Sequence, residues 1–321
     1  MTFLWGIHLY PPIHNCGAEY MAHGINKSLM ESGHHCRVLL YQANKHKITR
    51  AYEYEGVTVY PPIDPVALGR TADVIITHLD YTKAAIELGR KVNRPVVHLV
   101  HNDIPYQSIK DAPEVNVVYN SEWIKDKLNY PNNSFVLTPP CDWRYYDVNE
   151  NPEKSEYITL INLDLNKGGE VLTKIAKAMP DKKFLGVLGS YSADIKGQFS
   201  DQPGNVKVVP NTPDILSVYR QTRVLIMPSR YESWGRTATE AMCNGIPVVC
   251  SATPGLVEHC GKAGLFVDDR DDVDQWVRWI KRLDDKKFYN QASKLAKERS
   301  RELDPVKKLD EFKNWLLNLR R

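Results

Sequence analysis

The chain has 321 residues, of which 42% are hydrophobic, 25% charged and 10% aromatic, and its formal net charge is +3. This composition is typical of a globular protein, the length suits two domains of roughly 150 residues each, and no apolar run reaches the ~18 residues that a membrane span needs. The charge balance is too even to indicate a polyanionic partner, and the six cysteines lack the paired spacing of a zinc site or a disulfide framework. The start, "MTFLWGIHLYPP", has no basic leader, so we expect a cytoplasmic protein that begins with a strand.

Short apolar runs alternate with segments of helical length in both halves, which predicts parallel sheets with crossover helices. In the first half we expect strands at 3–10, 36–42, 73–79, 95–101, 116–121 and 134–140. In the second half we expect them at 157–163, 183–189, 206–210, 223–229, 246–251 and 264–269. The pattern therefore predicts an α/β protein with two doubly wound domains.

The segment "PPCDWRYYDVNENPEKSE" carries no hydrophobic period and is rich in proline, asparagine and acids, which indicates a linker. We therefore place the domains at 1–145 and 146–305. Residues 306–321 form an amphipathic basic helix with apolar side chains at helical spacing. Such a helix could lie on a membrane or a partner, but we expect it to pack back on the protein.

The segment "RYESWGRTATEAMCNG" follows a predicted strand and contains two carboxylates. Ligands of open parallel sheets bind outside the carboxyl ends of the strands, so Glu232 would lie in a binding loop and Glu240 inside the next helix. The free amides at the start of that helix, about Ser233 to Arg236, could bind a phosphate. Carboxylates accept hydrogen bonds from vicinal hydroxyls, so the set indicates a nucleotide-sugar. The alternative is a solvent-facing Glu232 and a Glu240 paired with a lysine or arginine.

This segment resembles the Glu-x7-Glu signature of family-4 glycosyltransferases, which are retaining enzymes of the GT-B fold with two Rossmann-like domains facing across a cleft. Five further segments resemble motifs of that family in the same order: "PPIHNCGAEYMAHGINKSLMESGHHCRVLL", "PVVHLVHND", "LDLNKGG", "PDILSVYRQTRVLIMPS" and "PGLVEHCGKAGLFVDD". The opening "HNCGAEYMAH" is similar to compact bacteriophage glycosyltransferases, some of which modify hydroxymethylated bases in DNA.

The resemblance implies roles for the second domain. Glu240 would bind the ribose hydroxyls, and Glu232 would contact the donor sugar near its reacting carbon. Ser233, Trp234 and Gly235 would present main-chain groups to the donor.

Three residues outside this segment also receive roles from the resemblance. Lys167 would neutralise the diphosphate, Gly17 would let the backbone approach the donor or acceptor, and His101 would face the sugar from the first domain. Taken alone, Lys167 could be a surface lysine, Gly17 a turn residue and His101 a structural histidine. We expect His98, on the other face of the same strand, to be structural.

Asn162 stands where the diphosphate motif of the family normally begins with arginine. Arg230 or Arg236, beside the start of the signature helix, could supply the missing charge, and we place Arg230 first. The family's double glycine and its "N-G-V-D" motif are replaced by Cys16-Gly17 and by Pro140-Cys141-Asp142. Both replacements narrow the space near the acceptor, so the resemblance predicts the reaction class but not the acceptor.

The resemblance implies a retaining transfer of a hexosyl or pentosyl unit from a nucleoside diphosphate to an acceptor hydroxyl, and we expect the donor to be a UDP-sugar. No cofactor or metal is expected, because Asp269 to Asp271 in "DDRDD" more plausibly cap the next helix.

The acceptor could be a hydroxymethylated base in DNA, for which Lys45, Lys47 and Arg50 form the best basic cluster, or a lipid, a glycan or a small molecule. An epimerase, a phosphorylase or a non-catalytic nucleotide-sugar binding protein of the same fold remains an alternative.

Overall fold

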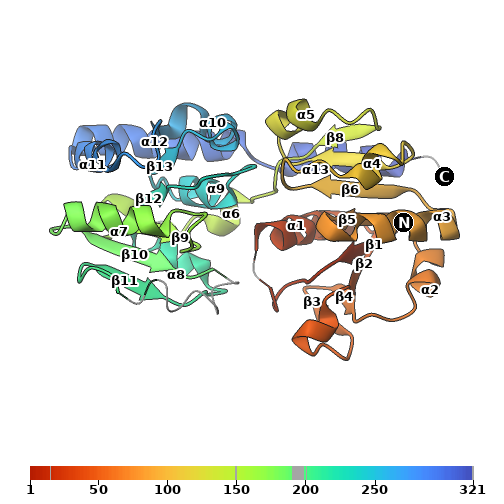
Figure 1. The fold of residues 1–321 in the computed structure, drawn as a ribbon. Coiled ribbons are helices and arrows are strands. Elements are labelled where there is room, and N and C mark those ends of the chain that lie inside the picture. Colours follow the sequence, from red (N-terminus) through yellow and green to blue (C-terminus); the bar gives the residue numbers. More distant parts are fainter. Residues whose placement is uncertain (15, 149, 190–198, 200, 320–321) are drawn as a thin grey trace. The chain divides into compact units, whose positions relative to one another are not determined.

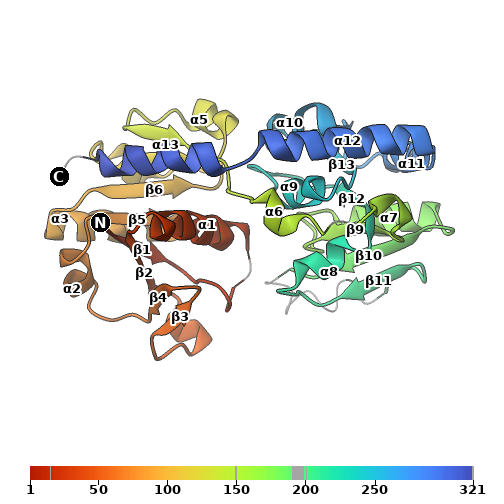
Figure 2. The ribbon, with the colours of Figure 1, turned by 180° about the vertical axis from the view of Figure 1, so that it is seen from behind.

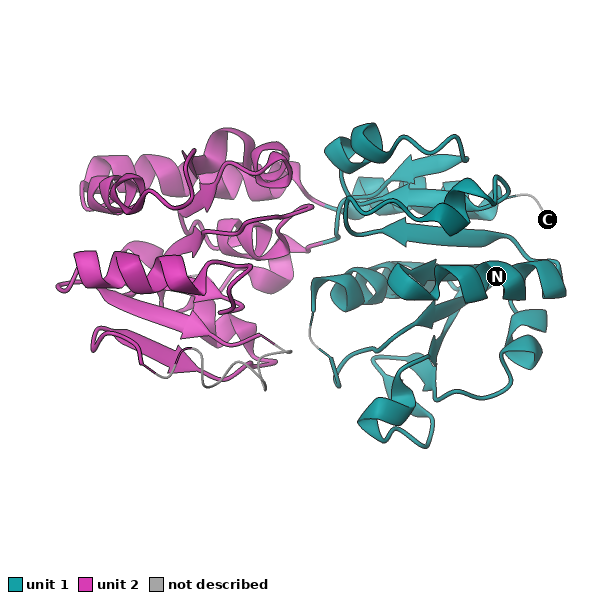
Figure 3. Cartoon of the chain, viewed as in Figure 1, with its two compact units in different colours: residues 1–140, 305–321 teal, residues 141–304 magenta. Residues whose placement is uncertain are grey.

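The computed structural model describes residues 1–14, 16–148, 150–189, 199 and 201–319, and the chain divides into two compact units (Figures 1 and 3). Unit 1 contains Met1–Pro140 and the C-terminal segment from Pro305, and unit 2 contains Cys141–Asp304. The first division lies earlier than the expected 145/146, because α6 (Trp143–Tyr146) packs against α9 (Arg236–Cys243) of unit 2. Within the described ranges, no helix combines the length and the apolar character needed to cross a bilayer.

Unit 1 is built on one eight-stranded sheet in the order β3-β4-β2-β1-β5-β6-β7-β8. Its strands are β1 (Thr2–Ile7), β2 (His35–Leu40), β3 (Tyr52–Tyr54), β4 (Val57–Tyr60), β5 (Val74–His78), β6 (Val96–Val100), β7 (Asn116–Tyr119) and β8 (Ser134–Val136). Its helices are α1 (Gly17–Glu31), α2 (Pro65–Arg70), α3 (Thr82–Val92), α4 (Gln107–Lys110), α5 (Glu122–Leu128) and α13 (Val306–Leu317), with short 3-10 turns at η1 (Ala43–His46) and η2 (Leu79–Tyr81). All neighbouring strands are parallel except β3 and β4.

The antiparallel pair β3 and β4 was not predicted from the sequence. The segment "YEYEGVTVY" contains the signal for it, since β-branched and aromatic residues flank a two-residue turn. Glu55 and Gly56 in this turn both have positive φ, 45° and 82°, as a type I′ turn requires. Glutamate is uncommon in this conformation, so the turn sequence is a weak hairpin signal.

The C-terminal helix α13 belongs to unit 1 and lies along its sheet (Figure 2). Phe312 and Leu316 are 1% and 0% exposed and join the core that also contains Trp5. Leu309, Trp315 and Leu319 pack on the same core. The protein itself therefore covers the apolar face of this helix. This packing is favourable because it removes apolar surface from water.

Unit 2 is built on a six-stranded sheet in the order β11-β10-β9-β12-β13-β14, and all its strand pairs are parallel. Its strands are β9 (Tyr157–Ile161), β10 (Lys183–Val187), β11 (Val206–Val209), β12 (Thr222–Met227), β13 (Val248–Ser251) and β14 (Gly264–Val267). Its remaining helices are α7 (Gly169–Ala178), α8 (Ile215–Tyr219), α10 (Pro254–Cys260), α11 (Val273–Arg282) and α12 (Lys286–Glu302), with 3-10 turns η3 (Pro152–Lys154) and η5 (Gly261–Ala263).

Each apolar run predicted as a strand forms one, and the prediction of two doubly wound parallel-sheet domains is confirmed. The strand order of unit 2 is the Rossmann order, which reverses direction between β9 and β12. In unit 1 the corresponding reversal lies between β1 and β5. Ligands of such sheets bind at the carboxyl ends of the strands beside this switch point, so each unit offers one such place.

Candidate active site

The loops after β9 and β12 bring Lys167 and Glu232 together at the switch point of unit 2. Lys167 Nζ lies 2.6 Å from Glu232 Oε1, and the hydroxyl of Ser229 donates to the same oxygen at 2.9 Å. Glu232 is only 8% exposed. The alternative of a solvent-facing Glu232 is therefore wrong, since a buried carboxylate needs such partners.

Gly168 explains how the two loops can approach each other. Its φ is +89°, and a Cβ at this position would lie 2.3 Å from the carbonyl oxygen of Pro228. Asp164 accepts a hydrogen bond from the amide of Lys167 at 2.9 Å, and Asn166 O accepts one from Arg230 N at 2.9 Å. Glycine is needed here because any side chain would push the lysine loop away from the loop that carries Glu232.

Arg270 joins the same two loops and was missed by the sequence analysis. Its guanidinium donates to Pro228 O at 2.6 Å and contacts Glu170. Burial opposes ionisation of Glu170, but its hydrogen bonds with Arg270 and Arg230 lower its pKa. The only signal in the sequence was a single arginine inside an acidic run.

The expectation that Asp269 to Asp271 cap the next helix is wrong. The residue that caps α11 is Asp272, which accepts hydrogen bonds from the amides of Asp274 and Gln275. Asp269 instead accepts from the amide of Asp271 within the preceding turn.

Glu240 lies inside α9 and has two partners. Arg236 Nε donates to Oε1 at 2.8 Å and the Tyr219 hydroxyl donates to Oε2 at 2.7 Å. Burial and the nearby carboxylate raise the pKa of Tyr219, so its hydroxyl keeps the proton that it donates. Arg236 also donates to the Tyr146 hydroxyl at 2.9 Å. The alternative reading of Glu240 as an ion-paired residue thus describes its contacts in this structure, although each oxygen retains capacity for a further hydrogen bond.

The side chain of Trp234 is part of the core rather than of an open surface. It is 4% exposed and stacks on the His259 ring with centroids 4.4 Å apart. His259 Nδ1 lies 2.8 Å from Trp234 O, and Nε2 lies 2.6 Å from the Thr239 hydroxyl. Burial lowers the pKa of His259 to about 3, and a carbonyl only accepts, so the neutral ring carries its proton on Nδ1. His259 therefore holds the main chain of the signature loop.

Two glycines shape the start of α9. Gly235 has φ +89° and precedes the helix, and a Cβ there would lie 2.7 Å from Leu256. A Cβ at Gly255 in α10 would lie 2.3 Å from the carbonyl oxygen of Glu232. Ser233, between these contacts, is partly exposed. The main chain from Glu232 to Gly235 is thus tightly fixed.

Asn162 and Arg230 differ in their surroundings. Asn162 follows β9 with φ +68°, a conformation that asparagine adopts more readily than arginine does. The Arg230 side chain is 59% exposed and its Nη2 lies 3.1 Å from Glu170 Oε1. Arg236, by contrast, is 13% exposed in its pair with Glu240, so Arg230 is the more accessible of the two candidate cations.

In unit 1, His101 follows β6 and contacts His78 at the end of β5. His101 Nε2 and His78 Nδ1 are 3.0 Å apart, and burial lowers the pKa of His101 to about 4. His98 is fully buried, its Nδ1 lies 2.7 Å from the Thr82 hydroxyl, and burial lowers its pKa to about 3. His101 thus lies at the carboxyl edge, whereas the surroundings of His98 are those of a core residue.

Gly17 is the first residue of α1, and a Cβ there would meet no atom of the described chain within 4 Å. Neighbouring His8, His14 and Glu19 gather at the same end of the helix. Burial opposes protonation of His14, but hydrogen bonds with Cys16 and Glu19 raise its pKa to about 9. No contact within the described chain requires glycine at position 17.

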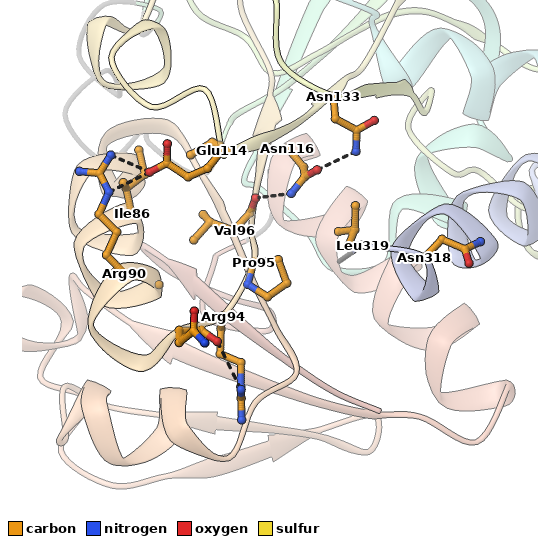
Figure 4. A pocket seen from close by; sticks show the side chains of 13 residues that line it. Ile86, Arg90, Arg94, Pro95, Val96, Glu114, Asn116, Asn133, Asn318 and Leu319 are labelled. Carbon is orange, nitrogen blue, oxygen red and sulfur yellow. Dashed lines mark hydrogen bonds and ion pairs between the residues drawn. The ribbon is translucent and has the colours of Figure 1, made fainter. Parts of the chain in front are cut away.

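A cavity of about 520 Å³ lies at the opposite, amino edge of the sheet of unit 1 (Figure 4). It is lined by the starts of β6 and β7 and by Asn318 and Leu319 near the C-terminus. Two of its polar side chains, Arg90 and Glu114, form an ion pair, and Asn116 donates to Val96 O (Figure 4). The cavity lies away from the carboxyl edge and does not include any predicted site residue.

Comparisons with known proteins identify a family domain within the second unit. Residues 147–299 match the family described as "Glycosyl transferases group 1". Over 92 residues the chain is 32% identical to mannosylfructose-phosphate synthase of Agrobacterium fabrum, covering 28% of this chain and 20% of the relative. Over 245 residues it is 23% identical to D-inositol 3-phosphate glycosyltransferase of Corynebacterium aurimucosum, covering 66% of this chain and 58% of the relative.

Among solved structures, HepE of Anabaena in complex with UDP and glucose is similar over 98% of both chains, with 17% identity and a TM-score of 0.77. The chain therefore contains a glycosyl transferases group 1 domain and has the GT-B fold, as predicted. It spans less than two thirds of the length of the two curated relatives above.

Proposed function

We propose that this protein is a retaining glycosyltransferase that moves a sugar from a nucleoside diphosphate to an acceptor hydroxyl. The observation that carries the proposal is the meeting of Lys167 and Glu232 at 2.6 Å beside the switch point of unit 2. An ammonium group at that edge suits a diphosphate, and a carboxylate suits sugar hydroxyls. Both residues lie inside the segment that matches the glycosyltransferase family.

Donor binding would rearrange the contacts of this ion pair. The diphosphate competes with Glu232 for the ammonium group of Lys167, which frees Glu232 to accept hydrogen bonds from the sugar. Glu240, held by Arg236 and Tyr219, would accept from the ribose hydroxyls with its remaining lone pairs. The main chain at Ser233, Trp234 and Gly235 would donate to the donor.

The leaving diphosphate gains negative charge in the transition state, so groups that stabilise this charge lower the barrier. Lys167 and the amino-terminal end of α9 supply positive potential there. We propose that Arg230 adds the charge that Asn162 lacks, because its side chain is 59% exposed and can turn toward a ligand. With these groups, the reaction would need no metal ion at the diphosphate.

We propose a UDP-sugar as the donor, supported by the fold similarity to HepE in complex with UDP and glucose. In unit 1, His101 and Gly17 would contribute to sugar and acceptor binding. His101 would act as a neutral imidazole, since burial lowers its pKa to about 4.

For the acceptor, we propose a hydroxymethylated base in DNA as one candidate beside a lipid, a glycan or a small molecule; it rests on a local basic cluster, because the net charge of +3 is too even to indicate a polyanion. Lys45, Lys47 and Arg50 are all exposed around η1, and such a basic loop would contact phosphates. The similarity of the opening segment to compact bacteriophage enzymes supports the same acceptor. Salt-dependent retention on hydroxymethyl-containing DNA would support this part, and transfer to a lipid, glycan or small molecule alone would overturn it.

The decisive experiment is a screen of UDP-, GDP- and ADP-sugars with a mixed acceptor pool, followed by mass spectrometry. A product heavier than an acceptor by one sugar residue, with its anomeric configuration retained by NMR, is the expected result. Release of a changed nucleotide-sugar without any acceptor would identify an epimerase instead. Binding of a donor without hydrolysis or transfer would identify a non-catalytic binding protein.

A further inference from the structure

A group of metal-ligating side chains lies at the switch point of unit 1. His8 follows β1, His14 lies in the loop after it, and Glu19 occupies the first turn of α1. His8 Nε2 is 2.6 Å and His14 Nδ1 is 3.2 Å from Glu19 Oε1. One ligand atom from each of the three residues lies within 4.8 Å of the other two.

The carboxylate of Glu19 in this group is buried. Its side chain is 1% exposed, and a carboxylate removed from water must be compensated by charge or hydrogen bonds. Oε2 of Glu19 has no hydrogen-bond partner among the residues that the structure describes. The two imidazoles therefore meet only one side of the carboxylate, and the other oxygen is available for a ligand.

We propose that His8, His14 and Glu19 bind one divalent transition-metal ion of the Zn²⁺ type. Two imidazole nitrogens and one carboxylate oxygen form the ligand set of open zinc sites, in which water fills the fourth position. Mg²⁺ and Ca²⁺ prefer oxygen ligands and would bind this set poorly.

The geometry fits such an ion with small side-chain movements. Zinc lies about 2.1 Å from its ligand atoms, which puts neighbouring ligand atoms roughly 3.4 Å apart, and the contacts of 2.6 and 3.2 Å need only a slight expansion. The side chain of His8 is 16% exposed, which leaves one side of the site open to water. His14 Nε2 lies 3.8 Å from Cys16 Sγ, a contact that would orient the ring as partners of metal-bound histidines do.

The ion would tie the segment after β1 to the start of α1. It does not belong to the diphosphate site proposed above, whose residues lie in unit 2. Metal binding is measured without a nucleotide-sugar, so its outcome is independent of the glycosyltransferase proposal.

The test uses the full chain, dialysed first against a chelator and then against chelator-free buffer. Titration with ZnCl₂ by calorimetry should show one equivalent bound with a Kd of about 1 μM or lower. Co²⁺ at the same site should give the visible absorption of a four- or five-coordinate ion, and Zn²⁺ should raise the melting temperature.

Two variants and one control make the test specific. Glu19→Gln and His8→Gln should each weaken Zn²⁺ binding by about 100-fold or more. Because Glu19 is buried, circular dichroism first checks that its variant folds, and the partly exposed His8 carries the test if it does not. His46→Gln, at an exposed histidine in η1, should bind like the parent protein. Absence of a one-equivalent site, or equal affinity in His8→Gln and the parent, would overturn the proposal and leave a cluster of histidines paired with Glu19.

Discussion

The two units place different chemistry at the same edge of similar sheets. Unit 2 holds permanently charged pairs, Lys167 with Glu232 and Arg236 with Glu240. Unit 1 instead surrounds the buried carboxylate of Glu19 with imidazoles. Lysine and arginine keep their charge at neutral pH, whereas histidine can lose its proton or bind a metal. This difference is the reason that we propose a diphosphate site in unit 2 and a metal site in unit 1.

The largest effect should come from removing permanent charge from unit 2. We expect Lys167→Ala to lower kcat for sugar transfer by about 100- to 1000-fold, because the charge on the leaving diphosphate loses its partner. Steady-state kinetics at saturating donor measures this change. Lys174→Ala, at an exposed lysine in α7, should stay within about twofold of the parent. An unchanged kcat in Lys167→Ala would remove this lysine from the mechanism.

The second test asks whether the close approach of the two loops in unit 2 depends on glycine. We expect Gly168→Ala to lower the free energy of unfolding by about 2–3 kcal/mol, since a Cβ would meet Pro228 O in a backbone with positive φ. Urea denaturation measures the change. Gly204 has ordinary φ and open space around it, so Gly204→Ala should shift stability by less than about 1 kcal/mol. Equal stability of the two variants would show that the loops adjust freely.

The third test uses the buried histidines of unit 1. Burial lowers the pKa of His98 from its ordinary 6.5 to about 3, so in this window the unfolded chain binds a proton that the folded chain does not. The contribution of His98 to the free energy of unfolding is therefore fully present above about pH 6.5. It is lost as the pH falls toward 3, by up to ~1.4 kcal/mol per pH unit.

Urea denaturation between pH 6.5 and pH 4.5 measures this slope. His98→Gln keeps a polar group near Thr82. In this variant the free energy of unfolding should depend less steeply on pH than in the parent. His46→Gln serves as the exposed control. If His98→Gln and the parent lose stability in parallel, another group causes the acid sensitivity.

The smallest effect is expected at Arg230, whose charge is largely exposed. Arg230→Ala should raise the KM for the donor by about two- to fivefold and change stability by less than about 0.5 kcal/mol, because water screens its charge. Donor-dependent kinetics and a melting curve check both values. A KM increase in Arg236→Ala alone would transfer the role to Arg236. No change of kcat or KM in either variant would show that the charge missing at Asn162 is not replaced by these arginines.

Local patterns along the chain are enough to predict the class of fold and the loops where ligands could bind. Alternating apolar runs and helical segments depend on local hydrophobic periods, which can be read along the chain. Strands followed by "LDLNKGG" and "RYESWG" predict Lys167 and Glu232 at the carboxyl edge, where ligand sites of parallel sheets lie. The hairpin of β3 and β4 was not predicted, and its turn residue, Glu55, is unusual for positive φ.

The partners of these residues, by contrast, depend on tertiary packing. Glu240 meets Tyr219, Arg270 meets Pro228, and His259 supports Trp234, although each pair is separated by twenty residues or more. The cluster of His8, His14 and Glu19 likewise has no recognisable motif spacing. The helix α13 packs on unit 1 although all of unit 2 separates it from the rest of unit 1 in the sequence. Such contacts depend on how distant segments pack against each other, and hydrophobic period and residue spacing carry no information on those distances.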